Sequence, residues 1–199
     1  MPSQGHSPAA PLRLATESGA IEERALPRWT AAPPSVPAMG PSSTVGEGAD
    51  EVRRLGLAVH RVLEWASAWP EAAGEVARLA DAAALEFEAP AAEVARRAGR
   101  IWHSPAGARF FRGAALRWAG NEVAVAESGD ILRIDRLVAL EEDGVRVWWV
   151  LDYKLRHAPA ELVDYREQMA RYVRAVRALE PGDAVRAAFV TGAGAVIEL

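Results

Sequence analysis

The chain has 199 residues, 50% hydrophobic and 25% charged, which is enough for one globular domain with a buried core. Its formal net charge of -4 excludes a uniformly basic surface, so any contact with nucleic acid needs a local group of arginines or a partner. The absence of cysteine excludes disulfides, thiolate zinc sites and cysteine-ligated iron–sulfur clusters, and it is consistent with a cytoplasmic protein.

The first part of the chain differs in composition from the rest. Residues 1–48 contain most of the prolines, among them Pro33, Pro34, Pro37 and Pro41, and show little periodicity. We expect a linker or a segment that lies on a partner, followed by one folded domain over residues 49–199. No stretch approaches the roughly 20 apolar residues of a membrane span, so no membrane partner is expected.

Helical spacing of apolar residues begins at Asp50 and continues to Ala66, and His60 lies within this predicted helix. A single histidine on a helix is more often a packing or surface residue than a ligand. Residues 71–84 and 91–100 are rich in alanine and predict two further helices, separated near Pro90.

Strands follow the helices. The remaining expected elements are strand material over residues 114–125 with a turn at Gly120 and Asn121, a strand ending at Asp135, a hairpin turn over residues 141–144, a strand over Val145–Lys154, an amphipathic helix over residues 161–179, and strands over residues 185–190 and 196–197. This order predicts an α/β fold with a mixed central β-sheet flanked by α-helices.

Charged residues converge at the end of the predicted hairpin. Alternate side chains of a strand share a face, so Asp152 and Lys154 project together, while Tyr153 points away and offers its backbone carbonyl. With Asp135 on the neighbouring strand, two carboxylates and an amine meet. This group suits a divalent metal and metal-assisted hydrolysis of a phosphodiester.

Lys154 is the only lysine among 23 basic residues. Arginine stays protonated, whereas the pKa of a lysine can be lowered, so the two are not interchangeable beside a water nucleophile. Chance survival of one lysine in an arginine-rich chain is the alternative interpretation.

Four short patterns follow one another: Gly56-x-x-x-His60, Asp135, Asp152-Tyr153-Lys154 and Gln168-x-x-x-Tyr172. In this order they resemble the PD-(D/E)xK nuclease superfamily, in particular the C-terminal nuclease domain of RecB- and AddA-type (UvrD-like) helicase–nucleases. The surrounding segments RLGLAVHRVLEWA, LRIDRLVAL, WWVLDYKLR and YREQMARYVRAV look like that family too. The resemblance covers about residues 53–190 and implies a restriction-endonuclease-like core.

The resemblance also implies a site. Mg2+, with Mn2+ able to substitute, would be held by His60, Asp135, Asp152 and the carbonyl of Tyr153. The catalytic residues would be Lys154, which activates water or steadies developing charge, with Asp135, Asp152, Gln168 and Tyr172. Gln168 and Tyr172 would orient the DNA strand or the lysine. The chain departs from the family at Leu132, where a glycine is common. Glu122 is either the acidic residue that the family has before this strand or an ordinary exposed glutamate of a strand.

The predicted function is therefore that of a Mg2+-dependent deoxyribonuclease, an exonuclease module of a helicase–nuclease in recombination and double-strand-break repair. Its partners would be single- or double-stranded DNA and a helicase motor. Three alternatives stay open: a non-catalytic nuclease fold that binds or guides DNA, a separate restriction-like endonuclease, and a structural α/β domain. Arg156, Arg171 and Arg174 are candidates for phosphate contacts or for an ordinary solvated surface.

Overall fold

The computed structural model describes residues 13–15, 21–23, 47–68, 76–155 and 159–199. The chain divides into two compact units, Met1–Ser43 and Thr44–Leu199. In the first unit, β1 (Arg13–Ala15) pairs antiparallel with β2 (Ile21–Glu23). Most of residues 1–48 lie outside the described ranges, so their role as a linker or partner-bound segment stays a prediction.

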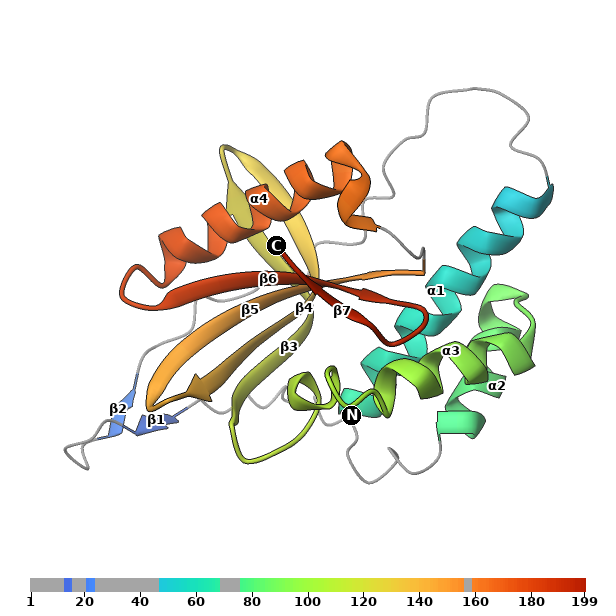
Figure 1. Cartoon of the computed structure of the whole chain (residues 1–199), viewed down its shortest axis with the longest axis horizontal. Coiled ribbons are helices and arrows are strands. Elements are labelled where there is room, and N and C mark those ends of the chain that lie inside the picture. The colour runs from blue at the N-terminus through green and yellow to red at the C-terminus, as the bar shows by residue number, and fades with distance from the viewer. Residues whose placement is uncertain (1–12, 16–20, 24–46, 69–75, 156–158) are drawn as a thin grey trace, which may run out of the picture. The chain divides into compact units, whose positions relative to one another are not determined.

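The described part of the second unit is built on a five-stranded sheet with the order β3-β4-β5-β6-β7 (Figure 1). Its strands are β3 (Leu116–Glu127), β4 (Asp130–Glu142), β5 (Val145–Lys154), β6 (Ala184–Thr191) and β7 (Val196–Glu198). All neighbours are antiparallel except β5 and β6, which are parallel and joined through helix α4 (Val163–Leu179). The predicted mixed sheet with flanking helices is confirmed.

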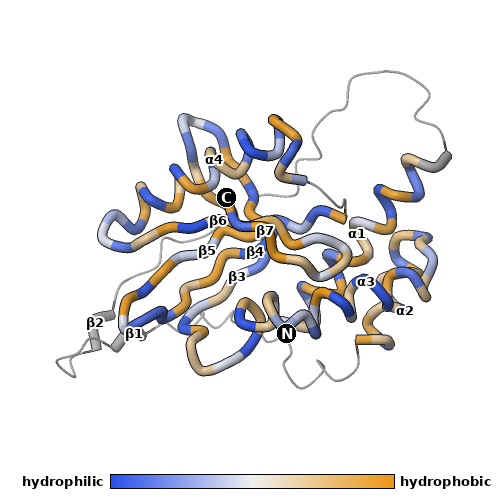
Figure 2. The backbone as a smooth tube through the Cα atoms, in the orientation of Figure 1, coloured by the Kyte–Doolittle hydropathy of each residue, from blue (hydrophilic) through white to orange (hydrophobic). Residues whose placement is uncertain are grey.

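Helices cover both faces of the sheet. On one face lie α1 (Glu47–Ala68), α2 (Val76–Phe87) and α3 (Ala91–Trp102), and on the other lies α4 (Figure 1). The alternation of β5 divides its side chains between two cores: Trp149 packs beneath α1–α3, and Val150 packs against α4. Hydrophobic residues accordingly dominate the central strands in Figure 2 and alternate with hydrophilic ones along α4.

Two expectations about the strands are wrong. Gly120 and Asn121 do not form a turn, because β3 continues through them and pairs with β4 on both sides. Gly120 is required by packing, since a Cβ atom there would lie 2.7 Å from the ring of Trp118. Asp135 does not end a strand either: β4 continues to Glu142, and Asp135 lies near its middle.

Candidate active site

Three strands bring one carboxylate each to the same region. The β4–β5 pairing extends as far as Arg136 and Leu151, so Asp135 and Asp152 are the next residues on the two strands. On the other side of β4, the pairing with β3 is interrupted at Glu122 and Asp135, and it is regular on both sides of them. Glu122 has a φ of 51°, a left-handed conformation that is uncommon for a residue other than glycine. The interruption therefore lies beside Asp135.

The Asp135 carboxylate is fixed by the backbone of β5. Its Oδ2 accepts a hydrogen bond from the Tyr153 N–H at 2.8 Å, which takes the place of the next rung in the β4–β5 ladder. His60 of α1 approaches the same point, and its Nε2 lies 3.2 Å from the Tyr153 carbonyl oxygen. The other ring nitrogen, Nδ1, lies 3.7 Å from Asp135 Oδ2. Tyr153 thus positions both side chains through its main chain.

One nitrogen and two carboxylate oxygens form a group that fits a divalent cation. Ligand atoms of His60, Glu122 and Asp135 all lie within 4.8 Å of one another, a spread that one ion with bonds of about 2.0 to 2.4 Å can span. Glu122 also lies 3.5 Å from the guanidinium of Arg133, on a partly exposed surface. One imidazole and two carboxylates are ligands that together suit a divalent metal ion.

The expected ligands Asp152 and Tyr153 adjoin this group, and their part in holding a metal stays a prediction. Asp152 is 1% exposed and its Oδ2 lies 2.8 Å from Lys154 Nζ, as expected for side chains two residues apart on a strand. The Tyr153 carbonyl faces His60 Nε2. Glu122, weighed only as a candidate from the sequence, stands in the group together with His60 and Asp135.

Burial controls the electrostatics of the two aspartates. It raises the pKa of Asp152 to about 7, and the nearby Asp135 carboxylate adds to this rise, while Lys154 opposes it. Burial also raises the pKa of Asp135 to about 6, against the effect of the Tyr153 N–H. The pKa of His60 is lowered, mainly because burial disfavours its charged form. A neutral imidazole beside carboxylates whose ionised form is disfavoured by burial is well suited to bind a cation.

Helix α4 covers Lys154. The ammonium nitrogen lies 4.7 Å from the centre of the Tyr165 ring, a cation–π contact that the sequence analysis missed. Gln168 Nε2 donates a hydrogen bond to the Tyr172 hydroxyl at 2.6 Å. Burial raises the pKa of Tyr172 to about 12, and repulsion from Asp152 and Asp135 adds to the effect. The sequence did hold a signal for Tyr165: it stands three residues before Gln168, so both side chains lie on one face of the helix.

A buried arginine connects the elements that carry the grouped ligands. Arg136 is 2% exposed, and its Nε donates to the Phe110 carbonyl at 2.9 Å while Nη1 donates to Asn121 Oδ1 at 2.6 Å. Its guanidinium also lies 4.8 Å from the centre of the Phe111 ring. Asn121 in turn donates to Ser67 Oγ at 2.9 Å. Helix α1 and strands β3 and β4 are thereby linked next to the site.

The arginines of α4 are engaged with carboxylates. Arg171 and Arg174 both donate to Glu127 at 3.0 Å, and Arg171 also donates to Asp130 at 2.6 Å. These contacts fasten α4 to the β3–β4 hairpin, which favours the structural interpretation of the two residues. Arg156 lies outside the described residues.

A site of this composition on a mixed α/β sheet defines a candidate metal-dependent hydrolase. The family model of the PD-(D/E)XK nuclease superfamily matches residues 39–196, more than half of the chain. The chain belongs to the PD-(D/E)XK nuclease superfamily, and its architecture is consistent with a restriction-endonuclease-like α/β fold. A search of curated proteins finds no match. Membership supports nuclease activity on DNA with a divalent metal.

Among the described helices, none has the length and apolar character needed to span a lipid bilayer.

Proposed function

We propose that this chain is a Mg2+-dependent deoxyribonuclease, acting as the exonuclease module of a RecB- or AddA-like helicase–nuclease in cytoplasmic DNA repair and recombination. The observation that carries the proposal is the meeting of His60, Glu122 and Asp135 next to the Asp152–Lys154 pair. Its chemistry matches the superfamily to which the chain belongs. The helicase partner rests on the sequence resemblance of the four motifs.

Each residue has a role that follows from its surroundings. His60, Glu122 and Asp135 hold the cation, and Asp152 completes its surroundings as the adjacent carboxylate. When bound, the cation polarises the scissile phosphate and lowers the pKa of a water molecule. Lys154 offers a compact positive charge beside that phosphate.

Helix α4 supplies the positioning groups of the proposed site. The Tyr165 ring limits the positions that the Lys154 ammonium can adopt. Gln168 fixes the Tyr172 hydroxyl, whose pKa is too high for it to ionise near neutral pH, so Tyr172 acts as a hydrogen-bonding group and not as a base. This pair would orient the DNA strand or the lysine.

The test is cleavage of linear single-stranded and duplex DNA with Mg2+ or Mn2+. Lys154→Ala and Asp152→Ala should each lower the rate by about 10²-fold to 10⁴-fold, the range for losing a positioned acid–base or electrostatic group. Arg117→Ala is the control, because Arg117 belongs to an exposed ion pair with Glu141 on the surface.

The outcomes separate the proposal from its main alternative. Metal-dependent cleavage that both variants lose supports the nuclease. Calorimetric Mg2+ binding without cleavage, even with a helicase motor added, would instead favour a module that binds or guides DNA. Equal cleavage by wild type and both variants would place the activity elsewhere.

A further inference from the structure

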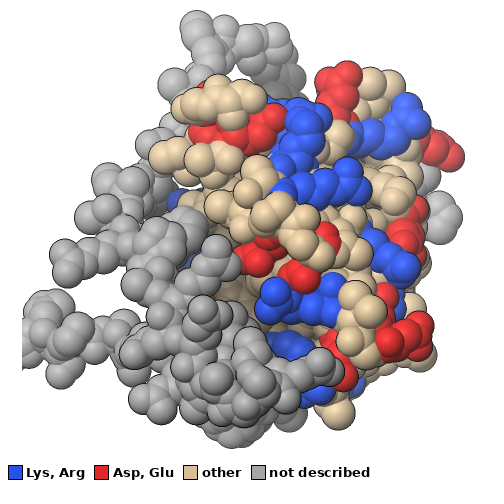
Figure 3. Space-filling model, turned by 90° about the vertical axis from the view of Figure 1, so that its left-hand side faces the viewer, with Lys and Arg blue, Asp and Glu red and all other residues tan. Residues whose placement is uncertain are grey.

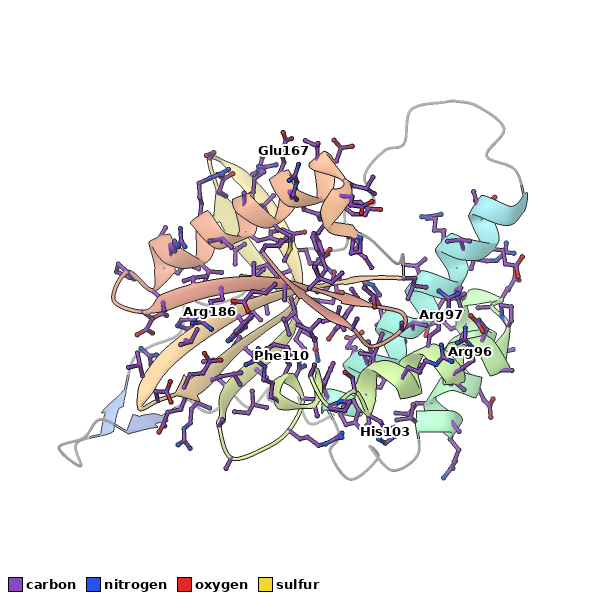
Figure 4. The ribbon with its side chains drawn as sticks, viewed as in Figure 1. Arg96, Arg97, His103, Phe110, Glu167 and Arg186 are labelled. Carbon is purple, nitrogen blue, oxygen red and sulfur yellow. The ribbon has the colours of Figure 1, made fainter. Side chains whose placement is uncertain are left out.

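A pocket of about 170 Å³ opens beside the candidate active site, at the carboxyl ends of the two parallel strands. Its lining comes from three segments: Arg96, Arg97 and Arg100 of α3, Leu155 after β5, and residues 191–193 after β6. Figure 4 shows Arg97 on α3 near the turn between β6 and β7, with Arg96 beside it. We call this feature the arginine pocket.

The arginine pocket is adjacent to Lys154 in two directions. Leu155 directly follows Lys154 in the chain, and Thr191 is paired with Lys154 across the β5–β6 ladder. Neighbouring strands lie about 4.8 Å apart. The pocket and Lys154 therefore lie at the same edge of the sheet.

The wall of the pocket is held in place by contacts within the fold. Ser104 Oγ donates a hydrogen bond to the Gly194 carbonyl at 2.6 Å, and a Cβ atom on Gly194 would lie 2.5 Å from the Arg100 carbonyl oxygen. A Cβ atom on Gly192 would lie 3.3 Å from Arg97 Nη1, so this guanidinium lies against the main chain of the turn. The turn after β6 is docked on α3, and the pocket is preformed.

The arginine pocket carries more positive than negative charge. Among the described residues, Glu93 is the one carboxylate paired with these arginines, at 2.5 Å from Arg96 and 2.6 Å from Arg97, and their hydrogen bonds lower its pKa to about 2. In the described part of the chain Arg100 has no ion-pair partner, so cations outnumber anions here by three to one. Over the face that Figure 3 presents, basic and acidic side chains lie side by side.

We propose that the arginine pocket binds a phosphate group of the nucleic-acid strand and so fixes the path of that strand past Lys154. This inference rests on the proposed nuclease function. Guanidinium groups bind phosphate oxygens through two parallel hydrogen bonds, and contacts of this kind position a strand without reading its sequence. Arg97 and Arg100 are the binding groups, and Glu93 orients Arg97 from behind.

The test measures binding separately from cleavage. Fluorescence anisotropy in EDTA would follow the full chain with a labelled 20-nucleotide single strand, at several salt concentrations. The Arg97→Gln, Arg100→Gln double variant is compared with an Arg117→Gln, Arg186→Gln control. The control removes the same charge from exposed ion pairs with Glu141 and Glu142.

We expect the pocket variant to bind about tenfold more weakly than the control, as for the loss of charge-assisted hydrogen bonds. The slope of log affinity against log salt should also become shallower by about 0.7, the value for one phosphate on a single strand. Melting temperatures within a few degrees of each other show that both variants fold. Equal affinity and equal slope in the two variants would overturn the proposal.

Two further comparisons identify the phosphate and keep the tests independent. Strands with and without a 5′-phosphate show which phosphate the pocket binds. If it is an internal phosphate, the pocket variant binds both strands more weakly. If it is the terminal phosphate, the pocket variant binds only the phosphorylated strand more weakly. Calorimetry should give both double variants the wild-type Mg2+ affinity, because neither touches the metal-binding group. If the chain binds strands through this pocket but never cleaves them, the nuclease proposal fails, whereas phosphate binding by the pocket stands.

Discussion

Replacing Asp152 by asparagine should stabilise the protein while abolishing the proposed activity. Asp152 is 1% exposed, and its pKa in the folded chain is about 7 against an ordinary 3.8. Because a tenfold change in an ionisation constant is worth about 1.4 kcal/mol, burying the ionised carboxylate costs up to roughly 4 kcal/mol. Part of this cost arises from the interaction with Asp135, and the variant also loses the ion pair between Asp152 and Lys154. We therefore expect the free energy of unfolding to rise by about 2 kcal/mol.

The sign of the effect depends on pH. A raised pKa means that the folded chain holds a proton more tightly than the unfolded chain, so stability falls as the pH rises from about 4 through about 7. The Asp152→Asn variant lacks this titration. It should therefore exceed the wild type in stability at pH 8, and the difference should shrink to less than about 1 kcal/mol at pH 4.

Urea unfolding at pH 4 and pH 8 in EDTA measures the difference, and thermal unfolding at pH 8 should show a rise of about 4 to 8 °C for a chain of this size. Asp81→Asn, which changes an exposed carboxylate on α2 in the same way, is the control. Adding Mg2+ at pH 8 should stabilise the wild type more than the Asp152→Asn variant. An Asp152→Asn protein less stable than wild type at pH 8 would refute the reasoning, because the charge would then be fully compensated in the fold.

Substitutions at three further residues probe the groups around the site. Glu122→Gly should gain about 1 kcal/mol of stability by relieving the left-handed backbone, yet bind Mg2+ at least about tenfold more weakly in calorimetry than wild type. Asn121→Ala should lower the free energy of unfolding by about 1 to 3 kcal/mol, measured in urea, because it removes a hydrogen-bond partner of the buried Arg136. Tyr165→Leu should reduce kcat several-fold with unchanged Mg2+ affinity, whereas Tyr165→Phe should retain the wild-type rate, since the ring over Lys154 is kept.

Periodicity predicted the elements whose buried faces are set by local spacing. The amphipathic pattern indicated α4, and the alternation along β5 predicted that Asp152 and Lys154 project together. The expected turn at Gly120 failed because turn propensity is weaker than strand pairing, and β3 has a full partner in β4. Glycine is needed at this position by the ring of Trp118, a neighbour that the turn rules do not consider.

The parts of the site that the sequence did not predict are contacts between distant residues. Tyr165 meets Lys154 only after α4 crosses over the sheet. The engagement of Arg171 with Glu127 depends on how far the β3–β4 hairpin extends, which no local pattern records. Glu122 joins His60 and Asp135 at the point where the backbone of β3 departs from regular pairing. Local spacing predicts which side chains share a face, whereas such contacts need the tertiary fold.

The partners of Arg136 bear on the charge of the site. A buried guanidinium is commonly balanced by a carboxylate, but here a carbonyl, an amide oxygen and an aromatic ring surround it. A carboxylate in the place of Asn121 would stand next to Glu122 and add a further negative charge near Asp135, whose pKa burial already raises. Uncharged partners therefore let Arg136 connect α1, β3 and β4 without making the ionised aspartates more costly, and the acidic group is left to be neutralised by the cation that it binds.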